Sequence, residues 1–370
     1  MKLRAGDWVE VRSREEILAT LDKNGRLDEM PFMPQMFQYC GQKFKVYKRA
    51  HKTCDTVYPI RGRRLSDAVH LELRCDGAAY GGCQAACLIF WKMAWLKPVN
   101  GKVTVTGPTS EVVRPAASSS TGTTEADVLA GAYTEDLGSP DGKRYICQAT
   151  QLPRFTTELN WWDIRQYVED LTSGNVTISR FFKGVTYVAY NNLINAGIGL
   201  GRILRWLYDR AQSLWGGVPY PRTRGSIPAD QPTPTCTLDL RPGELVRVKP
   251  FHEILPTLNT DNKNRGLYFD AEAVPYCSGE YRVWSRLNKF IDEKTGRLIT
   301  LKNSSILLEG VWCRSRYSEC RMFCPRSIYT WWREIWLERV IQEPGSELKN
   351  RPESLSHDHS NTTLRPCSKS

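Results

Sequence analysis

Short alternating runs of apolar and polar residues open the chain and return near its other end. In GDWVEVRSREEILATL, which begins at Gly6, residues 7–12 alternate and predict a strand, and EEILATL then predicts a helix of one to two turns. The stretch GELVRVKPFHEILPTL, which begins at Gly243, predicts a strand over residues 244–249 and a short helix in HEILPTL. The same two elements therefore occur twice.

These stretches belong to an internal repeat. An offset of 237 residues aligns the chain without a gap from Gly6 to Asp55. Four cysteines occur in both copies: Cys40 with Cys277, Cys83 with Cys320, Cys87 with Cys324, and, after a shift of one residue, Cys75 with Cys313. Trp91 and Trp95 align with tryptophans four residues further along, an insertion that one helical turn would absorb. We therefore expect a helix after the cysteine loop of each copy.

Each copy contains several short predicted strands, including residues 44–46 in the first copy and residues 281–283 and 296–310 in the second. The pattern GD-V-V followed by Y-G-F-V resembles small SH3-like barrels, over the first half of each copy only. The resemblance concerns architecture and implies nothing about function. The predicted fold class is α+β: duplicated SH3-like β-barrel modules, each with a cysteine-rich loop and a C-terminal helix, joined by a helical middle segment.

The composition along the chain predicts six segments. Ser, Thr and Pro dominate one linker, Pro and Gly another, and the tail is polar. The helical middle segment opens with Asn160 as the expected N-cap. The segments are a first repeat (1–100), a flexible linker (101–140), a helical segment (141–217), a Pro-rich linker (218–240), a second repeat (241–342) and a disordered tail (343–370).

The repeated cysteines are the leading candidates for chemistry. Their spacing is C-x7-C-x3-C in the first copy and C-x6-C-x3-C in the second, each with a remote fourth cysteine. Four thiolates form either a tetrahedral zinc site or an iron-sulfur cluster site. The candidate metal ligands are Cys40, Cys75, Cys83, Cys87, Cys277, Cys313, Cys320 and Cys324.

The metal is left open between an iron-sulfur cluster and zinc. The chain has no C-x2-C knuckle of the kind common in structural zinc sites, and nearby aromatic residues could shield a cluster from solvent. The alternative is that these cysteines are small buried side chains of the core. The cysteines without a counterpart, including Cys54 and Cys147, rank lower.

The chemistry expected of the 12 cysteines also depends on the cellular compartment. We expect no secretory signal and no transmembrane segment, and hence a cytoplasmic protein with reduced thiols. The net charge of +11 permits weak attraction to nucleic acid, but the excess is modest for 370 residues and the chain carries no recognised nucleic-acid-binding motif.

Two other features suggest chemistry less strongly. Cys54 follows His51 by three residues and precedes Asp55, although thiol triads usually assemble from distant segments. AGIGLGR lacks the glycine order of a dinucleotide-binding loop and is interpreted as a closely packed helix.

The sequence thus predicts a cytosolic metal-binding protein with an accessory or binding role, whose partner is a protein. The alternatives are an enzyme with a thiol or cluster in the first repeat, with unknown catalytic residues, and a nucleic-acid-binding protein.

Overall fold

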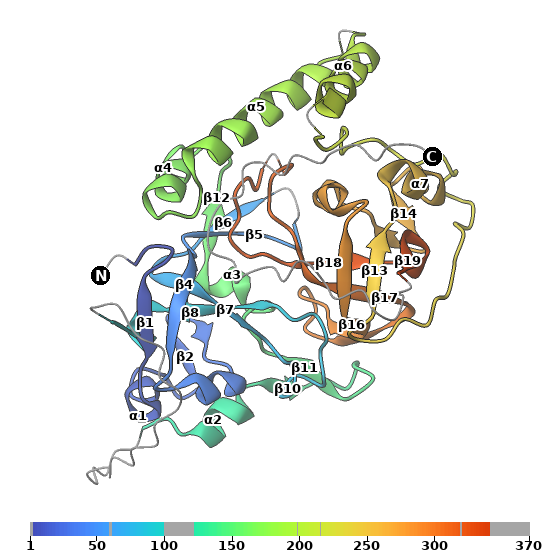
Figure 1. Ribbon diagram of the computed structural model, residues 1–370. Coiled ribbons are helices and arrows are strands. Elements are labelled where there is room, and N and C mark those ends of the chain that lie inside the picture. Colours follow the sequence, from blue (N-terminus) through green and yellow to red (C-terminus); the bar gives the residue numbers. More distant parts are fainter. Residues whose placement is uncertain are drawn as a thin grey trace, which may run out of the picture. The chain divides into compact units, whose positions relative to one another are not determined.

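The structure is a computed structural model that describes residues 3–58, 61–99, 122–197, 199–214, 216–318 and 320–340. It contains both helices and strands (Figure 1). The chain divides into two compact units: Met1–Asn191 with Trp284–Arg333, and Asn192–Val283 with Glu334–Ser370.

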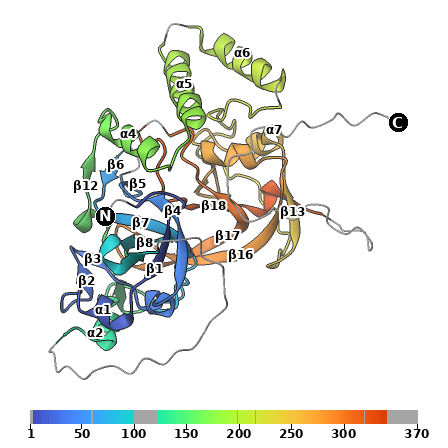
Figure 2. The same cartoon turned by 60° about the vertical axis from the view of Figure 1, so that its left-hand side comes forward.

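The first unit is built on an antiparallel five-stranded sheet in the order β8-β7-β4-β1-β9, four strands of which are labelled in Figure 2. The predicted strand over residues 7–12 is confirmed as β1. Its alternation has a physical role, because Val9 and Val11 are fully buried. The bounds are β1 Trp8–Val11, β4 Lys43–Arg49, β7 Ala68–Arg74, β8 Leu88–Lys92 and β9 Leu96–Pro98.

Tryptophans fill the core beneath this sheet. Trp91 and Trp95 are fully buried, and the ring of Phe32 meets both of them edge-on, with its centroid 5.1 Å from that of Trp95. Burying an aromatic ring of this size removes a large apolar area from water. These rings therefore fix the end of the cysteine loop that precedes β8.

A second five-stranded sheet has the order β18-β17-β16-β13-β19. Its registers match those of the first sheet: Val9 pairs with Phe44 and Pro98, and Val246 pairs with Tyr281 and Arg339. Strand order and register therefore repeat with the sequence, whereas the SH3-like interpretation stays a prediction. The bounds are β13 Leu245–Val248, β16 Glu280–Ile291, β17 Leu298–Trp312, β18 Tyr329–Trp332 and β19 Leu337–Arg339.

The C-terminal helix predicted for each copy is wrong. Strand β8 follows the first cysteine loop, and a single 3-10 turn, η2 (Met93–Trp95), then leads to β9; β18, η5 (Glu334–Trp336) and β19 repeat this order. All five residues of β8 are buried, and the unbroken apolar run of its first four residues, 88–91, has no helical period. The extra four residues of the second copy lie in the loop between Cys324 and β18.

The two predicted short helices are confirmed as α1 (Arg14–Leu18) and α7 (Phe251–Ile254), the latter continuing into η3 (Leu255–Thr257). Ser13 caps α1 through a capping box with Glu16. The smaller elements of the first sequence repeat are β2 Arg26–Leu27, β3 Met30–Pro31, η1 Pro34–Tyr39, β5 Lys52–Cys54 and β6 Gly62–Arg64. The second unit also contains β14 Lys263–Asn264, β15 Leu267–Tyr268 and η4 Ala271–Tyr276.

The middle segment is only partly helical. It begins with β11 (Lys143–Tyr145), α3 (Leu152–Phe155) and β12 (Thr157–Leu159), and β12 joins β6 and β5 in a three-stranded sheet. The helices that follow are α4 Arg165–Thr172, α5 Ile178–Ile194 and α6 Gly201–Leu214.

Two local predictions in this segment are wrong. Asn160 does not cap a helix, because α4 begins five residues later and the Asn160 carbonyl instead accepts bonds in a turn. Two of the three glycines of AGIGLGR lie outside the helices, and Gly201 is the first residue of α6. Gly197 and Gly199 have φ values of +74° and +75°, a left-handed conformation that separates α5 from α6.

Part of the expected linker over residues 101–140 is ordered, because it contains α2 (Glu125–Ala130) and β10 (Tyr133–Glu135), which pairs with β11. Arg14 and Glu125 form an ion pair of 2.6 Å between α1 and α2. Residues 100–121 and 341–370, including the predicted tail, lie outside the described residues. Residues 218–240 contain no helix or strand, and the linker expected there stays a prediction.

Candidate metal-thiolate site

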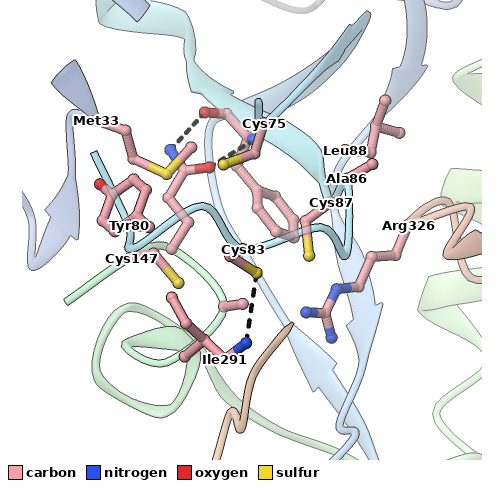
Figure 3. A pocket seen from close by; sticks show the side chains of 13 residues that line it. Met33, Cys75, Tyr80, Cys83, Ala86, Cys87, Leu88, Cys147, Ile291 and Arg326 are labelled. Carbon is pink, nitrogen blue, oxygen red and sulfur yellow. Dashed lines mark hydrogen bonds between the residues drawn. The ribbon is translucent and has the colours of Figure 1, made fainter. Parts of the chain in front are cut away.

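Four cysteines of the first unit line one cavity, which has about 450 Å³ of unfilled space, part of it open solvent. Three come from the cysteine loop: Cys75 follows β7, Cys83 lies in the middle, and Cys87 precedes β8. The fourth is Cys147, which follows β11. Figure 3 shows the four side chains around the cavity.

The loop between β7 and β8 gathers its three cysteines by closing on itself. The Cys75 N–H donates to the Cys87 carbonyl at 2.9 Å, so the first and last cysteines lie side by side. The N–H groups of Tyr80 and Gly82 both donate to the Gly77 carbonyl, and that of Cys83 donates to Tyr80. Residues 83–87 form no helical turn, and the tight turns of the loop lie before Cys83.

Gly77 is required by this turn. Its φ is +73°, and a Cβ atom there would lie 2.0 Å from the carbonyl oxygen of Cys83. Only glycine combines this conformation with so close an approach. Gly77 therefore fixes the turn that brings Cys75 and Cys83 together.

Backbone N–H groups interact with three of the four sulfurs. The donors are Gly77 for Cys75, Ala85 for Cys83, and Thr150 and Ala149 for Cys147; all but Thr150 are two residues further along the chain than the cysteine. Two further donors are the N–H of Ile291, 3.4 Å from the Cys83 Sγ, and the amide of Gln35, 3.1 Å from the Cys75 Sγ. Such donors favour the thiolate and are also typical of metal-bound thiolates.

Burial has the opposite effect on the pKa values of these thiols. It raises the pKa of Cys147 to about 11 and also raises the pKa values of Cys75, Cys83 and Cys87. The four groups are therefore neutral thiols near pH 7, none of them in a disulfide. Stable thiolates here require a positive charge.

Arg326 lines the same cavity, close to Cys87 in Figure 3. It is only 2% exposed, and its guanidinium donates to the Glu293 carboxylate at 2.8 Å. Tyr80 and Phe90 also line the cavity and are almost fully buried. The cavity thus combines four thiols, one buried cation and a mainly apolar wall.

Cys40 is not part of this group. It follows η1, does not line the cavity, and the charged groups that affect its thiol are Arg14, Glu15 and Glu125 of α1 and α2. Burial raises the pKa of Cys40 to about 11. Cys75, Cys83 and Cys87 therefore line one cavity together with Cys147, whereas Cys40 lies outside it, and the metal-ligand role of these cysteines stays a prediction.

The second set is divided. Cys313, Cys320 and Cys324 belong to the first unit, whereas Cys277 belongs to the second, where burial raises its pKa to about 12. Cys324 contacts Cys54, a cysteine outside the predicted set: the Cys54 N–H donates to the Cys324 Sγ at 3.1 Å. Within the described ranges, no three His, Cys, Asp or Glu side chains stand at the spacing of ligands around a bound metal ion.

The sequence neighbours His51, Cys54 and Asp55 do not interact as a catalytic triad. The His51 ring lies 3.2 Å from the Asp170 carboxylate, and the Asp55 carboxylate pairs with Arg63 at 3.4 Å. Cys54 instead faces Cys324. Residues in and next to β5 point to different neighbours, which explains why the closeness of His51, Cys54 and Asp55 in sequence was misleading.

A comparison of the chain with protein-family models, curated proteins and solved structures found no match. Among the helices that the structure describes, none is both long enough and apolar enough to cross a membrane.

Proposed function

We propose that this chain binds a metal centre through Cys75, Cys83, Cys87 and Cys147, as an iron-sulfur cluster or a zinc ion. The observation that carries the proposal is the convergence of four thiols from two distant segments on one cavity. Soft thiolate ligands select zinc, copper(I) and iron-sulfur clusters over hard cations.

The surroundings support a charged centre. Four thiolates around either metal leave net negative charge, which is costly to bury without compensation. The Arg326 guanidinium and the backbone N–H groups provide that compensation. Because metal binding deprotonates its thiols and is coupled to folding, the sulfurs can close to ligand distances when the metal enters.

The role that fits this site is accessory: a metal-stabilised module of a cytoplasmic protein that binds a partner protein. A single centre whose thiols are buried has a structural or electron-transfer role rather than an open coordination position. No contact in the described residues favours the thiol-enzyme or the nucleic-acid alternative.

Anaerobic purification of the full chain tests the proposal. We expect bound metal. Elemental analysis would identify zinc, whereas iron content, acid-labile sulfide and visible absorption would identify a cluster. Cys147→Ser should remove metal, and Cys40→Ser, which changes a half-buried cysteine outside the cavity, should retain it.

Cys147→Ser that keeps all of its metal overturns this site, as does folded wild-type protein that contains none. Loss of metal in Cys40→Ser with full retention in Cys147→Ser would instead support the ligand set expected from the repeat. The two variants therefore separate the geometry of the fold from the pattern of the sequence.

A further inference from the structure

A second group of cysteines lies in the first unit, apart from the cavity residues. Cys54 of β5 and Cys324 are both almost fully buried and lie against each other. Two N–H groups act on the Cys324 sulfur: that of Cys54, at 3.1 Å, and that of Arg326, again two residues further along.

The two other cysteines of the repeated loop border the same place. Cys313 is close enough for its charge to act on Cys324. Cys320 is located by Gly62, the residue opposite Cys54 in the β5–β6 ladder: a Cβ atom on Gly62 would lie 3.6 Å from the Cys320 carbonyl oxygen. Cysteines from β5 and from the second loop thus surround one end of this ladder.

The arrangement parallels that of the first cavity. Each cysteine loop supplies three cysteines at corresponding positions, and each is met by one cysteine that has no counterpart in the repeat: Cys147 for the first loop and Cys54 for the second. Arg326 serves both groups, because it lines the first cavity and also donates to the Cys54 carbonyl at 3.5 Å.

We infer that Cys54, Cys313, Cys320 and Cys324 form a second metal-thiolate site, of the same soft-metal class as the first. The inference deepens the proposed function and rests on its chemistry, but on different residues. It replaces Cys277, which the repeat alone would choose, with Cys54. The buried guanidinium of Arg326 partly neutralises both centres.

Metal per chain in anaerobically purified variants tests this inference. We expect Cys54→Ser to lose about half of the wild-type metal, Cys147→Ser to lose the other half, and the double variant to lose nearly all. Cys277→Ser is the matched control, because it removes the equivalent cysteine of the sequence repeat, and it should retain the wild-type content.

The outcomes separate the two sites. If Cys54→Ser retains full metal while Cys147→Ser loses it, the second site is overturned and the first stands. The reverse result overturns the first site alone. If Cys54→Ser does not fold, Cys320→Ser tests the same site from a half-buried loop position, and full metal content there also overturns the inference.

Discussion

A buried ion pair helps to hold together the chain segments that carry Cys54 and Cys324. The Lys52 ammonium lies 2.6 Å from the Asp170 carboxylate, and the two side chains are 4% and 0% exposed. Lys52 also donates to the Met322 carbonyl at 2.8 Å. The pair therefore ties β5, with Cys54, to α4 and to the segment just before Cys324.

Asp170→Asn keeps the shape of the side chain and removes its charge, which leaves the Lys52 ammonium buried without a counter-ion. Breaking a buried pair in this way costs about 3–5 kcal/mol. At about 2–4 °C per kcal/mol for a domain of 150–250 residues, the melting temperature should fall by roughly 6–20 °C.

The loss should depend on pH in a defined direction. Burial lowers the pKa of Lys52 below its usual 10.5, against the attraction of Asp170, and removing that attraction lowers it further. Below 10.5 the unfolded lysine binds a proton that the folded lysine has lost. Stability of Asp170→Asn should therefore rise with pH from the lowered pKa up to about 10.5.

Urea unfolding followed by circular dichroism at several pH values measures both effects. Glu125→Gln, which breaks the half-exposed pair with Arg14, should cost less than about 1 kcal/mol. Replacing both buried partners, as in Lys52→Met with Asp170→Leu, should recover most of the stability. A loss in Asp170→Asn no larger than that in Glu125→Gln would refute the reasoning.

Three further changes have expected outcomes. Gly77→Ala should abolish metal binding at the first site because its Cβ would overlap the Cys83 carbonyl, whereas Gly41→Ala, with the same φ of +73° and open space around it, should cost only about 1–2 kcal/mol. Gln148→Ala should lower the unfolding free energy by about 1–3 kcal/mol in urea titrations, because the Phe90 N–H loses its 2.8 Å bond. Burial lowers the pKa of His70 from 6.5 to about 3, so wild-type stability should fall as pH drops through that range, and His70→Gln should flatten this dependence in thermal melts.

Alternation in the sequence was enough to predict the strands that the repeat shares. Val9, Val11, Val246 and Val248 are fully buried at alternate positions, so their pattern reports directly on the face of the sheet. The same logic failed after the cysteine loops. Trp91 and Trp95 are four residues apart, as on a helix, but Trp91 is buried in a strand and Trp95 in a 3-10 turn, and the consecutive apolar residues 88–91 carry no helical period.

The partners of the cysteine loops could not be predicted from the repeat. An internal alignment identifies only residues present in both copies, and Cys147 and Cys54 have no counterpart. Their positions depend on tertiary packing: Cys147 follows a strand that begins more than fifty residues after the loop. The sequence ranked Cys54 and Cys147 lower than the other cysteines because neither has a counterpart in the repeat.

X-ray absorption at the edge of the bound metal tests the central claim most directly, because it reads the ligand atoms. Zinc held as proposed should show four sulfur neighbours at about 2.3 Å, and iron should show only sulfur and other iron atoms nearby. The spectrum of Cys147→Ser should lose the component from the first site. A first shell dominated by nitrogen or oxygen ligands would contradict the account.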